Sequence, residues 1–376
     1  MKKIMFMIES MIVGGAEKSL INLVNNLNKE EYDITIISMY KYSIYDGYEY
    51  NFKDLFNNNI KVKCLLDNSK KLSYKLFNFL YNKLPKTWSY KFFIKEKYDI
   101  EVAFYEGFPT TFLAYSNNKS SKKIAWLHTD SNNAFGKFDK IKLNETKNIY
   151  EKFDSIVGVA KSVCNSFENI FGLKDKLVVQ YNIFENNKII TKSKEDIEKN
   201  LKSDKFKLIS VGRLTPIKGY DRLLKCIKKL KDDGLEFELW IVGDGNEKSK
   251  LEKYIIENNL GNIVKLLGFQ DNPYKYIKEC NVFICSSLAE GFSTVVAEAI
   301  ILGKPIVTTK CSGMDELVGD GNCGLITENN EDSLYDGIKK ILTNNKLYEE
   351  LTNNSKEKAK FFVPNNIIKE LEKLLK

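Results

Sequence analysis

The sequence predicts an α/β protein built from two doubly wound, Rossmann-like domains. Three observations lead to this fold class: a length of 376 residues, strand-length apolar runs that alternate with helical patterns, and a polar break near the middle of the chain. A chain of this length exceeds what one ordinary core supports. Strands that alternate with helical patterns indicate parallel sheets. The polar break, residues 185–204, is the predicted linker between the domains.

The first predicted domain, residues 1–184, opens with one parallel α/β unit. The strand Ile4–Ile8 leads through a loop that ends in Gly14-Gly15 to a helix that starts near Ala16. The glycine pair indicates either a tight turn or a close approach of backbone to a ligand. It fits neither the G-x-G-x-x-G nor the P-loop pattern, so a nicotinamide or ATP site is not expected here. Further strands are expected at Tyr32–Tyr40, Asp99–Tyr105, Lys123–Leu127, Ser155–Val159 and Leu177–Tyr181.

The second predicted domain, residues 205–358, shows the same alternation of strands and helices. Residues 293–302 are expected to form a helix that Ser293 or Thr294 caps and that Gly303-Lys304-Pro305 ends. The tail, residues 359–376, is predicted to be a helix that packs back on the first domain. Strands are expected at Phe206–Val211, Leu239–Val242, Ile263–Leu267, Val282–Cys285, Ile306–Thr308 and Gly324–Ile326.

Charge and cysteine content narrow the classes of partner. A net charge of +8 suits an anionic ligand or an anionic membrane surface. No recognition motif or arginine-rich patch accompanies this charge, so a nucleic-acid partner is not expected. The seven cysteines form no C-x-x-C pair, which indicates free thiols in a reducing cytoplasm rather than disulfides or a zinc site. No apolar run approaches the roughly 18 residues of a membrane span, so we expect a cytoplasmic protein.

The segment Lys70–Lys97 interleaves lysines with leucine, phenylalanine and tryptophan, and only Glu96 opposes its positive charge. One interpretation is a pair of amphipathic surface helices with a solvated lysine face. The other is a patch that rests on anionic lipid at the inner face of the cell membrane. The pattern alone does not decide between the two.

The stretch from Ser286 to Ile300, a predicted strand end, loop and helix, carries two carboxylates, Glu290 and Glu298. Polar groups that follow a strand in an open α/β sheet lie where such sheets bind ligands. Eight helical residues rise about 12 Å, whereas paired glycosidase carboxylates lie about 5 to 9.5 Å apart. We therefore expect the two carboxylates to bind the two ends of an extended ligand rather than to act as an acid/base pair.

Lysine is so frequent in this chain that the two arginines, Arg213 and Arg222, and the single histidine, His128, stand out. Arg213 follows a predicted strand and Lys218 precedes a predicted helix, which suits the binding of a diphosphate. The alternative is that both are simple surface cations. His128 ends a predicted strand on the side where α/β sheets bind ligands, so we favour a functional role over a structural one.

Together these motifs resemble the retaining GT-B glycosyltransferases of glycosyltransferase family 4. The segment Glu290-x7-Glu298, with Gly291-Phe292, is similar to the E-x7-E signature of that family. The other matching landmarks are Gly14-Gly15-Ala16-Glu17, Trp126-Leu127-His128, Tyr181-Asn182, Val211-Gly212-Arg213-Leu214, Lys218-Gly219, Val242-Gly243-Asp244-Gly245 and Leu267-Gly268-Phe269. The resemblance covers nearly the whole chain and implies a GT-B fold, with two Rossmann-like domains that face a central cleft.

The resemblance also implies roles for the matching residues. Arg213 and Lys218 would bind the donor diphosphate and stabilise the leaving group, while Glu298 would hold the ribose hydroxyls and Glu290 the transferred sugar. His128 would lie near the sugar and, with Glu106, on the acceptor side. The catalytic set is then Arg213, Lys218, Glu290 and His128. Further donor contacts are expected at Gly14, Gly15, Gly212, Gly268, Phe269, Gly291, Phe292, Ser293, Thr294 and Val295. Ser293-Thr294 replaces a Gly-Leu pair that is common in the family, which bears on donor identity.

The implied activity is that of a retaining hexosyl- or N-acetylhexosaminyl-transferase. It would move a sugar from a nucleoside diphosphate sugar, UDP-linked, to a glycan or lipid-linked acceptor of cell-surface polysaccharide synthesis. The first domain would face the acceptor and the second would bind the donor. No metal or other cofactor is expected, because cations and a helix dipole can hold the departing diphosphate. Two alternatives remain open: a nucleotide-sugar epimerase or hydrolase on the same scaffold, and a non-catalytic sugar-nucleotide-binding partner protein.

Overall fold

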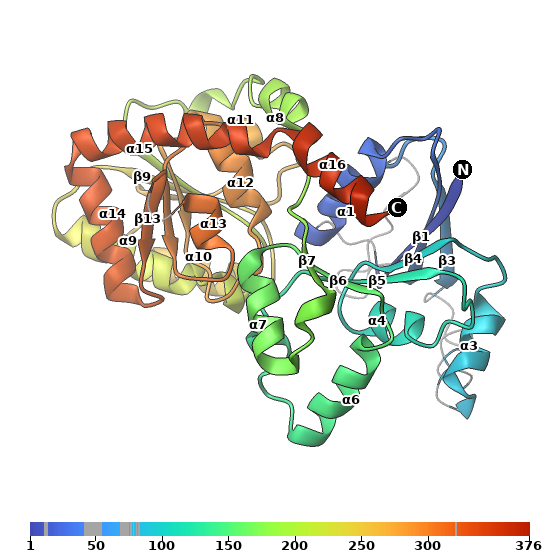
Figure 1. Cartoon of the computed structure of the whole chain (residues 1–376). Coiled ribbons are helices and arrows are strands. Elements are labelled where there is room, and N and C mark those ends of the chain that lie inside the picture. Colours follow the sequence, from blue (N-terminus) through green and yellow to red (C-terminus); the bar gives the residue numbers. More distant parts are fainter. Residues whose placement is uncertain are drawn as a thin grey trace. The chain divides into compact units, whose positions relative to one another are not determined.

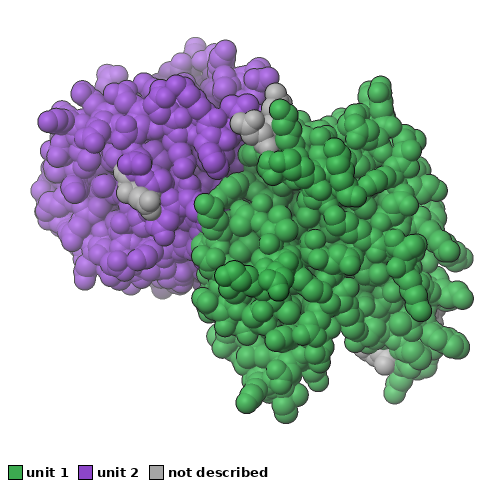
Figure 2. All heavy atoms as spheres, in the orientation of Figure 1, with its two compact units in different colours: residues 1–183, 365–376 green, residues 184–364 purple. Residues whose placement is uncertain are grey.

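A computed structural model describes residues 1–10, 14–40, 55–67, 75, 77, 79, 81, 83–319 and 322–376, without the side chains of residues 365 and 366. The chain divides into two compact units (Figure 2). Unit 1 holds residues 1–183 and 365–376, and unit 2 holds residues 184–364. Each unit is built on one parallel sheet, so the predicted α/β class with two Rossmann-like domains is confirmed.

Unit 1 contains a seven-stranded sheet in the order β3-β2-β1-β4-β5-β6-β7, in which every neighbouring pair is parallel (Figure 1). Its strands are β1 (Lys2–Ile8), β2 (Tyr32–Tyr40), β3 (Lys61–Leu66), β4 (Ile100–Ala103), β5 (Lys122–Leu127), β6 (Ser155–Gly158) and β7 (Leu177–Val179). Its described helices are α1 (Gly15–Asn26), α3 (Lys86–Phe93), α4 (Phe108–Leu113), α5 (Ser131–Phe135), α6 (Lys140–Tyr150), α7 (Lys161–Phe171), the 3-10 turn η2 (Lys174–Lys176) and α16 (Pro364–Leu374).

Unit 2 contains a six-stranded parallel sheet in the order β10-β9-β8-β11-β12-β13 (Figure 1). Its strands are β8 (Lys207–Val211), β9 (Glu238–Val242), β10 (Val264–Leu266), β11 (Val282–Cys285), β12 (Ile306–Thr309) and β13 (Gly324–Thr327). Its α-helices are α8 (Asn186–Lys192), α9 (Tyr220–Asp232), α10 (Lys248–Glu257), α11 (Tyr274–Glu279), α12 (Thr294–Ile301), α13 (Met314–Val318), α14 (Glu331–Thr343) and α15 (Asn345–Lys358). Its 3-10 turns are η3 (Lys199–Leu201), η4 (Pro216–Lys218) and η5 (Ala359–Phe362).

The core of unit 2 shows why its sequence forms these layers. Helices α9, α10 and α14 bury their apolar faces in one cluster with alternate residues of β8, β9, β11 and β12. Helix α12 is apolar on nearly all sides, and it lies against β11 and β12 and contacts α8, α11 and α15. An eight-residue helix that is buried all round must carry any polar residue, such as Glu298, into a dry environment.

Both sheets share one topological feature that places the site. The strand order reverses between β1 and β4 in unit 1, and between β8 and β11 in unit 2. At such a switch point the loops that follow the two central strands diverge and leave room for a ligand. The loop after β1 leads to Gly14, and the loop after β4 begins near Glu106. The loop after β8 carries Arg213 and Lys218, and the loop after β11 carries Glu290.

Three local expectations meet different outcomes. Ser293 is the N-cap of α12, but its side chain makes no capping hydrogen bond, so that part of the prediction is wrong. The segment predicted as a linker contains the helix α8, and α16 is grouped with unit 1 by its contacts. Lys122 Nζ donates to the carbonyl oxygen of Leu374 at 2.7 Å, which satisfies an acceptor at the end of that helix.

Candidate functional site

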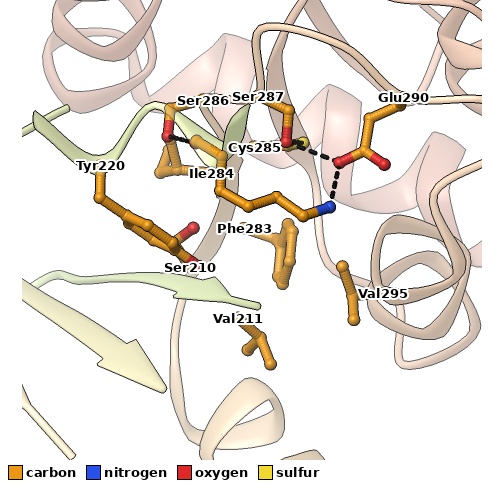
Figure 3. A pocket seen from close by; sticks show the side chains of 11 residues that line it. Ser210, Val211, Tyr220, Phe283, Ile284, Cys285, Ser286, Ser287, Glu290 and Val295 are labelled. Atoms are coloured by element: carbon orange, nitrogen blue, oxygen red, sulfur yellow. Dashed lines mark hydrogen bonds and ion pairs between the residues drawn. The ribbon is translucent and has the colours of Figure 1, made fainter. Parts of the chain in front are cut away.

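Lys218 and Glu290 form an ion pair at the switch point of unit 2, where β8 and β11 end (Figure 3). The distance from Lys218 Nζ to Glu290 Oε1 is 2.6 Å, and the two side chains are 25% and 11% exposed. The hydroxyl of Ser287 donates to the same carboxylate oxygen at 2.6 Å. A partly buried ion pair with a second hydrogen bond to the same carboxylate oxygen is a preorganised arrangement.

The loops that carry this pair are tied together by their backbones. Leu288 N–H donates to the carbonyl oxygen of Ile217 at 2.7 Å, and the Ser286 hydroxyl donates to the carbonyl oxygen of Lys218 at 2.9 Å. The loop after β8 and the loop after β11 therefore hold one shape. Their residues line a pocket with an empty volume of about 220 Å³, including space open to solvent (Figure 3). Its lining includes Ser210, Tyr220, Cys285, Ser287, Glu290 and Val295.

The charge state of Lys218 follows from two opposed effects. Burial disfavours its ammonium form, but the negative charge of Glu290 and the hydrogen bond between them outweigh burial, so the pKa of Lys218 is raised. The side chain is therefore a fixed cation at neutral pH. A ligand phosphate that bound Lys218 would take over part of the charge interaction that Glu290 now supplies.

Arg222, on α9, is buried and donates hydrogen bonds to the backbone of the loop after β11. Its Nε donates to the carbonyl oxygen of Ser286 at 2.8 Å, and its Nη2 donates to that of Ser287 at 2.6 Å. Its Nη1 donates to Asn329 Oδ1 at 2.6 Å. Arg222 is 7% exposed, so these hydrogen bonds are shielded from water. Arg222 stands out in the sequence by the rarity of arginine, but the sequence predicts no role for it.

Gly219 explains how α9 comes so close to that loop. Its φ is +64°, and a Cβ atom built on it would lie 2.2 Å from the carbonyl oxygen of Ser286. Only glycine combines this backbone conformation with that separation. Arg222 can therefore reach both carbonyl groups because Gly219, the N-cap of α9, has no side chain.

Arg213, by contrast, is exposed in the loop after β8. Its positive charge acts on the pKa of Lys218 in the lowering direction, so the two cations share one neighbourhood. Glu298 lies on α12 with 3% of its surface exposed and accepts a hydrogen bond from the Tyr274 hydroxyl at 3.2 Å. No motif in the sequence predicts the contact from Tyr274 to Glu298.

The remaining predicted donor contacts of unit 2 differ in exposure. Phe292 and Ser293 are buried at the start of α12, and Thr294 and Val295 are half-buried in its first turn. Phe269 is 56% exposed, after β10. The structure also places Gly212, Gly268 and Gly291 in loops that follow strands β8, β10 and β11.

In unit 1 the carboxylate of Glu106 holds the loop after β5. Its Oε1 accepts hydrogen bonds from the backbone N–H groups of His128 and Thr129, each at 2.8 Å. Glu106 is 9% exposed, and burial raises its pKa to about 7 despite these hydrogen bonds. Its Oε2 and His128 Nε2 are buried atoms without a hydrogen-bond partner among the residues that the structure describes.

His128 is a neutral imidazole in this environment. Its ring lies 4.8 Å from that of Phe104 and 5.8 Å from that of Tyr105, and burial lowers its pKa to about 3. A neutral imidazole accepts or donates a hydrogen bond but carries no charge near pH 7. Gly14 and Gly15 lie at the N-terminus of α1, directly after residues 11–13, which are outside the described part of the chain.

Two further features of the described residues concern metals and membranes. No group of three or more histidine, cysteine, aspartate or glutamate side chains gathers there as a metal site would require. Within the same residues, no helix has the length and apolar character needed to cross a bilayer.

Most of unit 2 matches a known protein family. Residues 192–358 match the family described as "Glycosyl transferases group 1". The chain is 38% identical over 217 residues to the N-acetylgalactosamine-N,N'-diacetylbacillosaminyl-diphospho-undecaprenol 4-alpha-N-acetylgalactosaminyltransferase of Campylobacter jejuni, covering 57% of this chain and 58% of that protein. The chain thus spans about half the length of the first curated relatives that it matches.

Longer matches extend over both units. An uncharacterized glycosyltransferase of Haemophilus influenzae is 27% identical over 383 residues and covers 100% of both chains. The crystal structure of Anabaena Alr3699/HepE in complex with UDP and glucose has a TM-score of 0.79 at 20% identity, covering 100% of this chain and 99% of that one. Sucrose-phosphate synthase from Thermosynechococcus elongatus also has a TM-score of 0.79, at 16% identity, covering 100% and 98%. The fold is therefore that of the GT-B glycosyltransferases.

Proposed function

We propose that the protein is a retaining glycosyltransferase that moves a sugar from a UDP-linked donor to a glycan or lipid-linked acceptor in cell-surface polysaccharide synthesis. The observation that carries this proposal is the ion pair of Lys218 and Glu290 at the β8/β11 switch point, inside the region that matches the group 1 glycosyl transferases. A cation and a carboxylate held in one pocket suit the two parts of such a donor, its diphosphate and its sugar hydroxyls.

Relatives support the donor and the acceptor classes. Two similar crystal structures are complexes, one with UDP and glucose and one with UDP-glucose. The name of the Campylobacter jejuni relative includes an undecaprenol-linked acceptor and an N-acetylgalactosaminyl transfer. Other relatives are named for lipopolysaccharide core, amylovoran and capsular polysaccharide synthesis. A hexosyl or N-acetylhexosaminyl donor and a lipid-linked or polysaccharide acceptor follow as the proposed substrates.

The proposed chemistry is departure of the nucleoside diphosphate as positive charge develops at the anomeric carbon. Arg213 and Lys218 would stabilise the negative charge on the departing diphosphate, together with the amides at the start of α12, residues 293–295. The leaving phosphate would take the proton of the acceptor hydroxyl on the same face of the sugar, so the anomeric configuration would be retained. No step needs a metal in this scheme, and that absence stays a prediction.

The carboxylates of unit 2 and several residues of unit 1 have proposed roles as well. Glu290 would orient the sugar hydroxyls and Glu298 the ribose hydroxyls, while Gly212, Gly268, Phe269, Gly291 and Phe292 would complete the donor site. His128 and Glu106 would lie on the acceptor side, with Gly14 and Gly15 approaching the phosphate. Because His128 is neutral, it would act as a hydrogen-bonding group. The predicted domain limits, 1–184, 185–204, 205–358 and 359–376, and the cleft between the domains belong to this proposal.

The surface around α3 supports peripheral contact with an anionic membrane. Phe79, Trp88 and Phe92 are 61%, 68% and 58% exposed, and Lys83 and Lys91 are exposed among them. Exposed aromatic rings among lysines suit the boundary between lipid headgroups and acyl chains. Part of the predicted segment Lys70–Lys97 lies outside the described residues. We place the protein in the cytoplasm, with this surface against the inner face of the cell membrane.

The proposed function is tested by nucleotide binding followed by product analysis. A panel of nucleotide sugars is screened by thermal unfolding, because a ligand of the native state raises the melting temperature. The stabilising donor is then incubated alone and with polyprenyl-diphosphate-linked sugars. Transfer that needs the acceptor supports the proposal, whereas an altered donor sugar or free sugar without acceptor would indicate an epimerase or a hydrolase. Binding without any turnover would indicate a non-catalytic partner protein.

A further inference from the structure

Tyr274 and Glu298 connect two helices, and Glu298 belongs to the proposed donor site. Tyr274 is the first residue of α11, and its hydroxyl donates to Glu298 Oε1 on α12 at 3.2 Å. The two helices are in contact, and both belong to unit 2. Glu298 is 3% exposed, whereas Tyr274 is half-buried. The phenol therefore approaches a carboxylate that solvent hardly reaches.

A glutamate needs such a contact if it is to bind a diol in one geometry. The terminal torsion of a glutamate side chain is broad, so the plane of its carboxylate is not fixed by rotamer preference. A hydrogen bond to one oxygen from a rigid phenol restricts that rotation. The carboxylate has about four acceptor positions, so acceptor capacity remains for two ligand hydroxyls.

The electrostatics of the pair keep the phenol in its donating form. Burial raises the pKa of Tyr274, and the negative charge of Glu298 raises it further, so the hydroxyl stays protonated across the physiological range. The hydrogen bond thus has one direction, from tyrosine to carboxylate. Water, by contrast, could donate to the carboxylate from many directions and would fix none of them.

We propose that Tyr274 is a positioning residue that orients the Glu298 carboxylate toward the ribose diol of the donor nucleotide and so sets a preference for ribonucleotides over deoxyribonucleotides. This inference rests on the proposed function, in which Glu298 holds the ribose. It adds a residue that does not touch the ligand and that acts only through the carboxylate. A ligand without the 2′-hydroxyl keeps only one of the two hydroxyls that the carboxylate would bind, and it should therefore depend less on Tyr274.

The test compares matched ribo- and deoxyribonucleotides by calorimetry on the full chain. UDP and dUDP, GDP and dGDP, and ADP and dADP are titrated, and the pair whose ribonucleotide binds most tightly is used. We expect the wild-type protein to prefer the ribonucleotide. Tyr274→Phe should weaken ribonucleotide binding roughly tenfold and deoxyribonucleotide binding much less, so that the preference for the ribonucleotide shrinks. If Tyr274 served only to stabilise the fold, Tyr274→Phe would instead weaken the binding of both nucleotides equally.

Tyr276→Phe is the matched control on the same helix. The Tyr276 hydroxyl donates to Glu198 Oε1 at 2.8 Å and lies 3.1 Å from Gln270 Oε1. Tyr276→Phe therefore also removes a hydrogen-bonded hydroxyl group, but it should leave the preference for ribonucleotides unchanged. Tyr274→His, which keeps a ring donor, is the second variant and should restore part of the preference. Thermal unfolding without ligand checks that each variant is folded.

The outcomes separate this inference from the proposed function. A wild-type preference that Tyr274→Phe leaves unchanged would overturn the inference about Tyr274 and leave the proposed donor site standing. A wild-type protein that binds ribo- and deoxyribonucleotides equally would overturn both the ribose role of Glu298 and the inference that depends on it. No binding of any of the six nucleotides would overturn the proposed donor site itself.

Discussion

The guanidinium of Arg222 donates to the carbonyl oxygens of Ser286 and Ser287, the latter at 2.6 Å, and so fixes the loop that presents Glu290. A planar fork makes these contacts at once, whereas a lysine ammonium is a point charge on a flexible stem. Arg222→Lys is therefore expected to lower the free energy of unfolding by about 3 kcal/mol, since buried acceptors would lose their charged donors. Urea denaturation of both proteins measures this difference.

The other arginine of the chain supplies the control for Arg222. Arg213 is exposed, so Arg213→Lys should leave the free energy of unfolding within about 0.5 kcal/mol of wild type. If Arg213 binds the diphosphate as proposed, the same substitution should lower the rate of transfer. Equal effects of the two substitutions on stability would mean that the buried hydrogen bonds of Arg222 contribute little.

Gly219 tests the close approach of α9 to the loop after β11. Gly219→Ala would place a methyl group 2.2 Å from the carbonyl oxygen of Ser286 at a φ of +64°. We expect a loss of at least about 3 kcal/mol in the free energy of unfolding, because backbone strain and a clash with backbone add. Gly234, with a φ of +79° and no atom within 4 Å of an added Cβ, is the matched control. Gly234→Ala should cost only the conformational strain, about 1 to 2 kcal/mol.

Lys218 is expected to act through its fixed positive charge. Lys218→Ala should lower kcat by roughly 100- to 1,000-fold, the usual effect of removing one preorganised group that stabilises developing charge. Its raised pKa adds a pH prediction: the rate should show no loss from deprotonation of Lys218 up to about pH 10. Initial rates from pH 6 to pH 10 measure both effects. A kcat for Lys218→Ala near the wild-type value would contradict the leaving-group role.

The strands that carry the site could be predicted because their sequences are unambiguous. The apolar runs at β1, β8 and β11 are bounded by polar loops, and their carboxyl ends are where parallel sheets bind ligands. The positions of Lys218 and Glu290 after two such strands predict that both lie near one ligand. They do not predict the 2.6 Å ion pair, because a contact between residues 72 positions apart depends on strand order, which periodicity does not contain.

What the sequence did not reveal has local physical causes. The edge strand β3 has exposed lysines at both of its Lys positions, so its pattern lacks the apolar run that marks an inner strand. The prediction of a side-chain cap for α12 was wrong, because the buried hydroxyl of Ser293 has no hydrogen-bond partner among the described residues. The hydrogen bond from Tyr274 to Glu298 joins two helices. It depends on how the helices pack together, which the sequence pattern of either helix alone does not predict.

The aromatic surface around α3 makes a prediction about lipid. Trp88→Ser combined with Phe92→Ser should abolish co-sedimentation with vesicles that contain phosphatidylglycerol, because both exposed rings are lost from the surface. Lys91→Glu should weaken vesicle binding by about 1 kcal/mol for the lysine charge removed. It should also make binding depend less on anionic lipid. Binding should also fall as salt rises.

Ile256→Ser is the control for that surface. Ile256 is 75% exposed on α10, in unit 2, so its loss removes as prominent an apolar side chain from elsewhere. It should leave vesicle binding unchanged. Wild-type protein that sediments equally with phosphatidylcholine vesicles and with vesicles that contain phosphatidylglycerol would remove the membrane part of the proposal.

Glu106 predicts how stability depends on pH. Its pKa of about 7 in the folded protein lies above its ordinary value of 4.5, so the folded state holds this proton more tightly than the unfolded chain does. Its stabilising contribution is therefore complete below about pH 4.5 and is lost as the pH rises toward and through 7. The nearby His128 has the opposite sign, because its lowered pKa gives a contribution that is present above about pH 6.5 and is lost as the pH falls toward 3.

Glu106→Gln separates the effect of Glu106 titration on stability from that of His128 titration. The amide oxygen can still accept the backbone N–H groups of His128 and Thr129, but it does not titrate. Relative to wild type, the variant should gain stability as the pH rises from 4.5 to 7, by an amount on the order of 3 kcal/mol. Urea denaturation at pH 5 and pH 8 measures this gain, and an unchanged difference between the two proteins would mean that Glu106 titrates near its ordinary value. If the backbone contacts alone matter for activity, Glu106→Gln should keep the transfer rate that Glu106→Ala loses.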